Sequence, residues 1–213
     1  MLTPLVAAEP GWLLSPGVVQ ETAPLLAAAR QGSADAQYQL ANRYFQEGDM
    51  TQDYRQAVHW SEQAARAGHA RAQYLLAFLY EAGLGVRQDH HQALYWYRQA
   101  AEQGNASAQY LLGSHFSVAG QNDLNDETAA YWLGQAAAQG MATAQYELAQ
   151  LYQDGRGVAQ DEVTAAGWLR QAAAQGLLPA QLELGVRWIT TRPWNGSSRP
   201  QHRAAVRRNT SWV

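Results

Sequence analysis

The tripeptide Ala-Gln-Tyr recurs at a fixed interval and constrains the fold more than any other feature of this chain. It occupies 36–38, 72–74, 108–110 and 144–146, and the related Ala-Gln-Leu occupies 180–182. The interval is 36 residues each time. A fixed period of this length is typical of repeat arrays, in which each unit is one supersecondary element that cannot bury its apolar face alone. The chain is therefore expected to be a stack of similar units.

Glycines mark the boundaries of these units. Four full units and a closing half unit each open with a glycine: 32–67, 68–103, 104–139, 140–175 and 176–189. Glycine just past a helix is the usual left-handed stop, so each is expected to follow the last helix of a unit. Residues 23–31 match the end of a unit. They extend the array to 23–189 and leave 1–22, which is rich in proline and glycine, as an irregular lead-in.

Each unit contains two stripes of residues with helical spacing. The first stripe follows the i, i+3, i+4, i+7 pattern and in the first unit comprises Gln37, Leu40, Ala41 and Tyr44. The second stripe of the same unit comprises Ala57, Trp60 and Ala64. Every unit is therefore expected to form two helices, A and B, which pack through small residues while the tryptophan supplies contact area.

The segment between the two helices differs among the units. The second and fourth units have Gly-x-Gly-Val loops at 83–86 and 155–158, which the first and third units lack. These segments do not indicate a phosphate-binding loop, because no third glycine or Lys-Ser/Thr follows them. Helix B is expected to begin near an N-capping residue in each unit: Asp53, Asp89, Asn125 and Asp161.

Taken together, these motifs resemble the Sel1-like repeat, a relative of the tetratricopeptide repeat. The unit Gly-x-x-x-Ala-Gln-Tyr-x-Leu-(Ala/Gly)-x-x-Tyr, the Gly-x-Gly-Val loop and Ala-x-x-Trp-x-x-x-Ala-Ala carry the resemblance, which covers about 27–189. It implies an all-α fold, a right-handed α-solenoid of antiparallel helix pairs with about four repeats plus terminal half-repeats. It also implies a role in protein binding, since family members serve as adaptors in signalling, secretion and protein quality control.

Charge is divided unevenly along the chain. The formal net charge is −3, and all fifteen basic residues are arginine. Residues 1–189 contain ten arginines and all eighteen acids, a net charge of −8, whereas 190–213 contain five arginines and no acid. An array of negative charge is not expected to attract nucleic acid. The basic segment 190–213 is predicted to be a flexible tail whose own binding preference stays open.

The N-terminus does not predict export. Its first eight residues, Met-Leu-Thr-Pro-Leu-Val-Ala-Ala, have no charged n-region and too short an apolar run before a proline and a glycine. The default expectation is a cytoplasmic protein. A periplasmic protein is the alternative if the true start lies upstream, because Val6-Ala7-Ala8 has the small residues of a signal-peptide end. No apolar run has the length of a membrane span.

Columns that change from unit to unit mark the candidate binding site. The packing columns of helix A stay fixed, whereas an adjacent stripe varies although the fold does not require it. In tetratricopeptide-like solenoids the first helices line the concave side, so the resemblance implies that this stripe faces a protein or peptide partner. Phe45 and Phe78 are the expected aromatic anchors. The candidate partner-binding residues are Tyr38, Asn42, Phe45, Tyr74, Phe78, Glu81, Tyr110, Ser114, Ser117, Tyr146, Gln150 and Gln153.

Two readings remain open for the four tyrosines of this set. They recur without change in the Ala-Gln-Tyr motif, as a packing residue would, yet they lie beside the variable stripe. The sequence does not decide between a core position and a groove position for them.

Signals for catalysis or metal binding are weak. The run Asp89-His90-His91 contains metal-ligand types, but neighbouring residues on a helix point about 100° apart, so both imidazoles cannot easily face one ion. The chain has no cysteine and no Gly-x-Ser-x-Gly nucleophile elbow. We therefore expect no catalytic residues, no cofactor and no metal.

The sequence thus predicts a non-enzymatic scaffold or adaptor for protein–protein interaction, of bacterial type, that holds a peptide or protein on the concave face. The alternative is an inhibitor or immunity protein for a secreted enzyme or toxin, or else a hydrolase. The sequence does not identify the partner.

Overall fold

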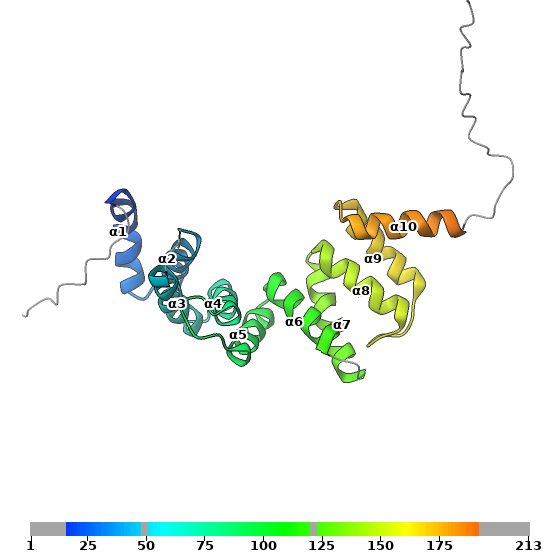
Figure 1. Ribbon diagram of the computed structural model, residues 1–213, viewed down its shortest axis with the longest axis horizontal. Coiled ribbons are helices and arrows are strands. Elements are labelled where there is room, and N and C mark those ends of the chain that lie inside the picture. The colour runs from blue at the N-terminus through cyan, green and yellow to red at the C-terminus, as the bar shows by residue number, and fades with distance from the viewer. Residues whose placement is uncertain (1–15, 48–50, 120–122, 192–213) are drawn as a thin grey trace, which may run out of the picture.

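The computed structural model describes residues 16–47, 51–119 and 123–191, and within these ranges it contains ten α-helices and no strand (Figure 1). The helices are α1 (Pro16–Arg30), α2 (Ala34–Glu47), α3 (Thr51–Arg66), α4 (Ala70–Ala82), α5 (His90–Glu102), α6 (Ala106–Ala119), α7 (Asp123–Ala138), α8 (Ala142–Asp154), α9 (Glu162–Ala174) and α10 (Leu178–Thr191). We call α2, α4, α6, α8 and α10 the A helices, and α1, α3, α5, α7 and α9 the B helices. The two kinds alternate along the chain, as the repeat pattern predicted.

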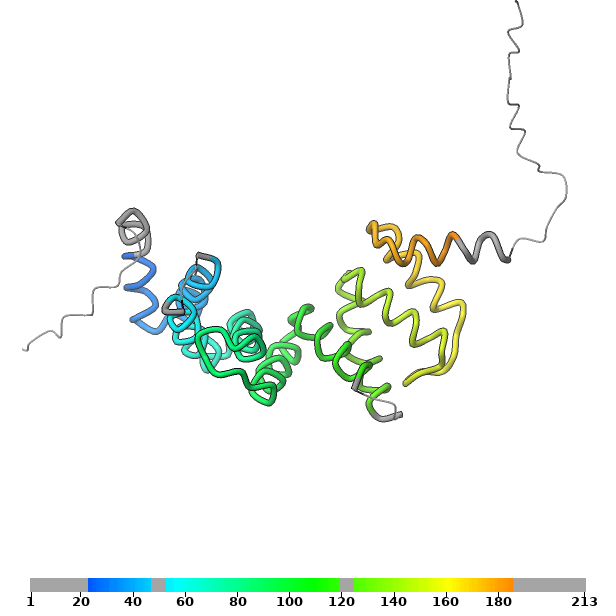
Figure 2. Tube along the Cα trace, viewed as in Figure 1, coloured from blue at the N-terminus to red at the C-terminus, as the bar shows by residue number. Residues whose placement is uncertain are grey.

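Each helix packs mainly against the helices that precede and follow it in the chain. The helix pairs therefore follow one another along a curved array, with α1 at one end and α10 at the other (Figures 1 and 2). This arrangement confirms the predicted all-α solenoid. Since every unit contacts its neighbours only, a contact that holds one unit to the next determines the shape of the whole array.

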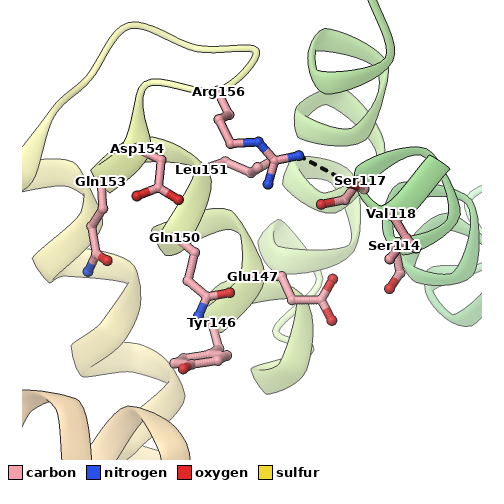
Figure 3. A pocket seen from close by; sticks show the side chains of 10 residues that line it. All are labelled: Ser114, Ser117, Val118, Tyr146, Glu147, Gln150, Leu151, Gln153, Asp154 and Arg156. Carbon is pink, nitrogen blue, oxygen red and sulfur yellow. Dashed lines mark hydrogen bonds between the residues drawn. The ribbon is translucent and has the colours of Figure 1, made fainter. Parts of the chain in front are cut away.

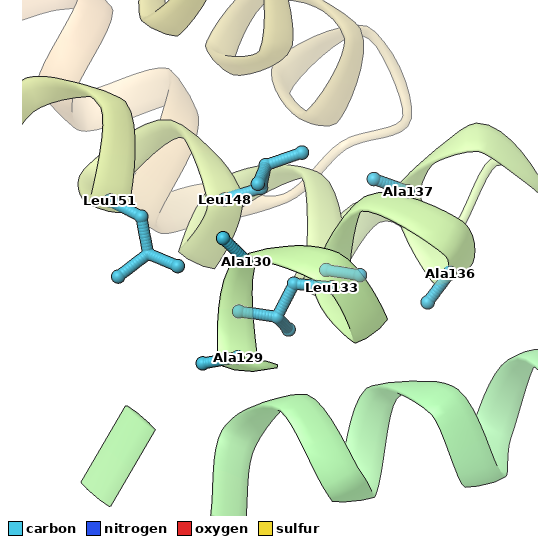
Figure 4. Packing of buried hydrophobic residues seen from close by; sticks show 8 residues of the cluster. Ala129, Ala130, Leu133, Ala136, Ala137, Leu148 and Leu151 are labelled. Atoms are coloured by element: carbon cyan, nitrogen blue, oxygen red, sulfur yellow. The ribbon is translucent and has the colours of Figure 1, made fainter. Parts of the chain in front are cut away.

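Alanine and leucine form the core between successive helices. In the third and fourth repeats, Leu133, Leu148 and Leu151 interdigitate with small residues such as Ala129 and Ala136 (Figure 4). The alanines let the helix backbones approach closely, and each buried leucine stabilises the fold by about 2 kcal/mol. The repeated tryptophans are half-buried at the edge of this core rather than enclosed by it.

Glycines end the B helices in the left-handed conformation, as predicted. Gly32, Gly68, Gly104, Gly140 and Gly176 all have φ between 85° and 92°. At the end of α3, the N–H of Gly68 donates to the carbonyl of Ala65 and the N–H of His69 donates to that of Ala64, both at 3.0 Å. These bonds satisfy carbonyls that the helix leaves without a partner.

The glutamine of the Ala-Gln-Tyr motif connects the A helices α4, α6 and α8 to the B helices on both sides. Gln73 Nε2 donates to the carbonyl of Ala65 at 3.1 Å, and Gln73 Oε1 accepts a hydrogen bond from Gln103 Nε2 at 2.6 Å. We call this pair of bonds the amide relay. It explains a fixed glutamine on an otherwise apolar stripe, because a buried amide is stable only when it is hydrogen-bonded. The same carbonyl bond is made by Gln37, Gln109, Gln145 and Gln181.

The relay is incomplete in the first repeat. Ala67 occupies the position that Gln103, Gln139 and Gln175 occupy in the later repeats, where each donates to the glutamine of its A helix. Gln37 Oε1 is consequently buried without a hydrogen-bond partner. A buried acceptor left in this way costs about 1–3 kcal/mol.

The predicted starts of helix B are confirmed in two repeats and wrong in two. Asp89 caps α5, with its Oδ1 accepting from the N–H groups of His91 and Gln92, and Asp161 caps α9 in the same way. By contrast, α3 and α7 begin two residues before Asp53 and Asn125, which therefore lie inside the first turn. Those two repeats lack the Gly-x-Gly-Val loop, whose glycines turn the chain so that helix B begins after the aspartate.

The ends of the array also differ from the expected boundaries. Helix α1 begins at Pro16 rather than near residue 23, because proline is tolerated in a first helical turn, where its missing N–H needs no partner. Helix α10 continues to Thr191, two residues past the predicted end of the solenoid. The rest of the expected lead-in, 1–15, and of the basic tail, 192–213, lies outside the described residues, so those expectations stay predictions.

Candidate partner-binding site

The twelve candidate residues lie on four A helices, three on each of α2, α4, α6 and α8. None of them is fully buried: Glu81 and Gln150 are exposed, and the other ten are half-buried. A surface that changes from repeat to repeat therefore runs along the A helices. Binding of a partner by this A-helix surface stays a prediction.

The four tyrosines connect neighbouring repeats while keeping one edge at the surface. The ring of Tyr38 stacks on His69 of the next repeat with ring centroids 4.7 Å apart. The hydroxyl of Tyr110 donates to Glu147 of the next repeat at 2.8 Å, and burial followed by this carboxylate raises the pKa of Tyr110. All four rings pack against the array and are half-buried, so none is fully enclosed in the core, and their role in a groove stays a prediction.

Phe45 and Phe78 meet on the A-helix surface of the first two repeats. Their rings are in edge-to-face contact with centroids 5.6 Å apart. Phe45 also packs against the buried cluster that includes Ala41 and Leu79. The assumption that these phenylalanines lie apart from the packing residues is therefore wrong for Phe45. Replacing it would remove core contacts as well as any contact with a partner.

Glu81 is held in place by a buried tyrosine of the same repeat. The hydroxyl of Tyr97, whose residue is 3% exposed, donates to Glu81 Oε2 at 2.6 Å. Burial, and then the bond to Glu81, raise the pKa of Tyr97, so its hydroxyl stays protonated and keeps donating at neutral pH. The carboxylate at this position of α4 is consequently oriented before any partner arrives.

A cavity of about 510 Å³ opens on the same surface between α6 and α8 (Figure 3). Five of its lining residues were predicted from the variable columns: Ser114, Ser117, Tyr146, Gln150 and Gln153. Sequence reasoning did not assign the other five to the site: Val118, Glu147, Leu151, Asp154 and Arg156. The cavity thus concentrates candidate residues of the third and fourth repeats, which the variable columns could not show to be adjacent.

Arg156 forms the wall of this cavity and joins the two repeats. Its guanidinium makes a two-bond contact with the carboxylate of Asp126, at 2.6 and 3.3 Å, and donates to the carbonyl of Ser117 at 3.0 Å. Asp126 is 8% exposed. Two parallel N–H···O bonds fix the guanidinium geometrically, so the cavity wall is rigid.

Two polar side chains of the cavity take no part in the fold. Neither the Gln150 amide nor the Asp154 carboxylate has a hydrogen-bond or ion-pair partner among the described residues. Gln153, in contrast, donates to Glu183 of α10 at 2.6 Å. An amide that offers both a donor and an acceptor suits the backbone of an extended peptide, and a carboxylate suits a cationic or hydrogen-bonding side chain.

The described residues show no arrangement for metal chemistry. Among them, no three histidine, aspartate or glutamate side chains gather to hold an ion. Asp89, which the sequence placed beside two histidines, is engaged as the N-cap of α5. Over the same part of the chain, every helix is too short or too polar to cross a bilayer.

Comparison with known families assigns the repeats. The Sel1 repeat model matches residues 34–69, 70–105, 106–141 and 142–177. The chain belongs to the Sel1 repeat family, as its motifs indicated. Proteins built from these repeats are generally non-enzymatic scaffolds for protein–protein interaction. No curated protein sequence matches the chain.

Two solved structures of bacterial proteins are similar to this chain. One is c5321, a protective antigen present in uropathogenic Escherichia coli strains and displaying an SLR fold, with 35% identity, a TM-score of 0.71 and coverage of 78% of this chain and 36% of its own. The other is a Sel1 repeat protein from Oxalobacter formigenes, with 36% identity, a TM-score of 0.70 and coverage of 76% and 47%. The chain thus spans less than half the length of either structure.

Proposed function

We propose that the A-helix surface of this array binds an extended segment of a partner protein, with the cavity between α6 and α8 as the main contact. The observation that carries the proposal is the pair of unengaged polar side chains, Gln150 and Asp154, beside a cavity of about 510 Å³. Residues that the fold uses are fixed by its packing, whereas these two are available to a ligand.

Rigid surroundings support this role. Arg156 is held by Asp126 and by the carbonyl of Ser117, and Glu147 is held by the hydroxyl of Tyr110. A partner would therefore meet a surface that needs little ordering on binding, which reduces the entropic cost of association. Val118, 85% exposed at the edge of the cavity, offers an apolar contact beside the polar groups.

Site-specific photocrosslinking tests the proposal. A benzophenone amino acid placed at Gln150 should crosslink a discrete partner in the native host, whereas the same group at exposed Gln135 on helix α7 serves as the matched control. The recovered partner is then titrated against the Gln150→Ala/Asp154→Ala variant. We expect affinity to fall about tenfold, the effect of losing roughly 1.4 kcal/mol of contacts.

Two outcomes would contradict the proposal. Crosslinks at Gln135 as frequent and as specific as those at Gln150 would move the site to the B helices. Unchanged affinity in the folded double variant would remove the cavity from the interface. The alternative of an enzyme inhibitor would be supported only if the crosslinked partner were an enzyme whose activity the array blocks.

A further inference from the structure

A second hollowed surface lies on the B helices of the first two repeats. One hollow of about 370 Å³ lies between α1 and α3 and is lined by Arg30, Gln56, His59 and Trp60. Another, of about 410 Å³, lies between α3 and α5 and is lined in part by Arg66, Tyr95 and Trp96. Both hollows are formed between successive B helices, away from the cavity of the A helices.

The two hollows present the same constellation one repeat apart. Each combines an arginine from the end of one B helix with an aromatic pair from the middle of the next, and the equivalent residues are separated by one 36-residue period. The rings of His59 and Trp60 are edge-to-face with centroids 5.0 Å apart. Those of Tyr95 and Trp96 have the same separation and nearly the same angle. The same hollow is therefore present in two successive repeats.

The fold does not require arginine at these positions. The corresponding residues of the next two B helices are Glu102 and Ala138, and both are exposed, as Arg30 and Arg66 are. The third repeat retains the aromatic pair, Tyr131 and Trp132, at 4.9 Å. The aromatic pair is thus present in the first three repeats and absent from the fourth, which has Gly167 before Trp168, whereas an arginine beside the pair is confined to the first two hollows.

Helices α3 and α5 carry three arginines and three acids, but each hollow is lined by one arginine and by no acid, whereas the array as a whole is negatively charged. Along the exposed side of α3 and α5, Arg55, His59 and Arg66 are followed by Arg98. The acids of these two helices are Asp53, Glu62 and Glu102. Glu62 is already shared, because it accepts from the hydroxyl of Tyr80 at 3.3 Å and lies 3.7 Å from Arg66. The side chain of Arg66 is 67% exposed, so most of its five donors face solvent.

We propose that this B-helix surface binds an acidic segment of a partner protein. Carboxylates of the segment would lie at Arg30 and Arg66, one repeat apart, and its apolar side chains would pack on the aromatic pairs between them. Guanidinium groups recognise carboxylates through paired hydrogen bonds, and an exposed aromatic such as Tyr95, 54% exposed, contributes contact area at low entropic cost. This binding does not depend on the A-helix site, so the array would hold two segments on separate surfaces.

Isothermal titration calorimetry with a synthetic acidic peptide tests the proposal on the full chain. The probe is a capped peptide of repeating Glu-Leu-Ser, and its Gln-Leu-Ser counterpart is the control for charge. The double substitution Arg30→Glu/Arg66→Glu should weaken binding of the acidic peptide about tenfold. It removes two exposed ion pairs with the peptide and adds repulsion between carboxylates. Arg170 is an exposed arginine of α9 outside both hollows and serves as the control. Arg170→Glu should alter binding by less than about twofold.

Tyrosine variants provide a second test that keeps the charge constant. Tyr95→Ala should weaken binding about threefold, whereas Tyr131→Ala, similarly exposed but one repeat further on, where Glu102 replaces the arginine, should leave it unchanged. Arg66→Glu alone is the variant to use if the double change disturbs folding. Glu102→Arg should strengthen binding by creating a third groove. Equal binding of the glutamine peptide, equal effects of Arg66→Glu and Arg170→Glu, or no binding of the acidic peptide would each overturn the proposal.

Discussion

The junction between the first and second repeats and the junction between the third and fourth have the same backbone and different side chains. In both, the Gly-x-Gly-Val loop of the later repeat lies against the start of the preceding B helix. At the first junction Leu84 of the loop packs in an apolar cluster with Tyr54 and Phe45. At the second, the equivalent residues are Arg156, Asp126 and Ser117, which are joined by hydrogen bonds.

This difference indicates that the loop position and the facing position of the preceding B helix change together, from Leu84 and Tyr54 to Arg156 and Asp126. The arginine has a carboxylate beside it, and the leucine has aromatic rings. The backbone contact that both junctions share is maintained by glycine, while the side chains decide whether the surface above it is apolar or polar. Variants of the loop glycines and of the side chains above them separate these two contributions.

The largest effect is expected where the backbone contact itself is removed. A Cβ at Gly157 would overlap the carbonyl of Asp126, and one at Gly85 would overlap that of Tyr54. Gly157→Ala and Gly85→Ala should therefore each destabilise by about 3–5 kcal/mol, from steric overlap added to a left-handed φ. Denaturant titration measures the change.

Helix-end glycines provide the matched control for this prediction. Gly104 and Gly140 also have positive φ, but a Cβ at either would meet no atom within 4 Å. Alanine at these positions should cost only about 1–2 kcal/mol. If all four substitutions had the same effect on the free energy of unfolding, the contact between the loop and the preceding helix would contribute nothing to stability. The two junctions would then share no stabilising backbone contact.

An intermediate effect is expected from exchanging the side chains of one junction. Arg156→Leu leaves Asp126 buried without its ion pair and should destabilise by about 1–3 kcal/mol, less than for a fully buried pair because Arg156 is 38% exposed. Adding Asp126→Tyr recreates the leucine and tyrosine of the first junction and should recover at least half of this loss. A double-mutant cycle measures the coupling. Strictly additive effects would show that the columns vary independently.

Completing the amide relay should give a smaller, stabilising effect. Ala67→Gln places a donor where Gln37 Oε1 lacks one and should raise stability by about 0.5–1.5 kcal/mol. Ala67→Leu, of similar size but without a donor, should not. Thermal unfolding of both variants measures the change in stability. If Ala67→Leu stabilised the protein as much as Ala67→Gln, the gain would come from apolar contact and not from a hydrogen bond to Gln37.

The smallest effect concerns the pH dependence of one helix cap. Hydrogen bonds from the Thr164 hydroxyl and then from the backbone N–H groups of Thr164 and Val163 lower the pKa of Asp161 from the ordinary value of an aspartate. A carboxyl with a lower pKa in the folded state stabilises the protein above its unfolded-state pKa, and the contribution disappears as pH falls through the folded-state value. Thr164→Val should move the pKa of Asp161 upward in an NMR titration. An unchanged titration would exclude the hydroxyl as the main cause.

Much of the fold could be predicted from the sequence because the repeat displays its packing columns four times. The glycine stops and the caps at Asp89 and Asp161 follow from local backbone chemistry, which a short segment determines by itself. The starts at Asp53 and Asn125 were predicted by analogy between repeats, and the analogy failed where the loop lacked its glycines.

The candidate site was harder to predict because its geometry depends on contacts between repeats. Variable columns identified Gln150 and Ser117, but not that Arg156 would donate to the carbonyl of Ser117 across a repeat boundary and line the same cavity as Gln150. The signal was present in the paired changes from Tyr54 and Leu84 to Asp126 and Arg156. The relation between Ala67 and the unsatisfied Gln37 likewise required a contact that spans one helix pair.

The loop glycines have a consequence for how such a chain can change its length. Glycine-bearing loops occur in the second and fourth repeats, and each lies against the repeat before it. Loss of the third repeat alone would bring the loop that carries Arg156 beside α5, where His90 holds the position of Asp126. Loss or duplication of the third and fourth repeats together would keep the Arg156 loop with the helix that carries Asp126. We therefore expect a repeat without the glycine loop and the repeat that follows it, rather than a single repeat, to be the unit that can be gained or lost without a mismatch.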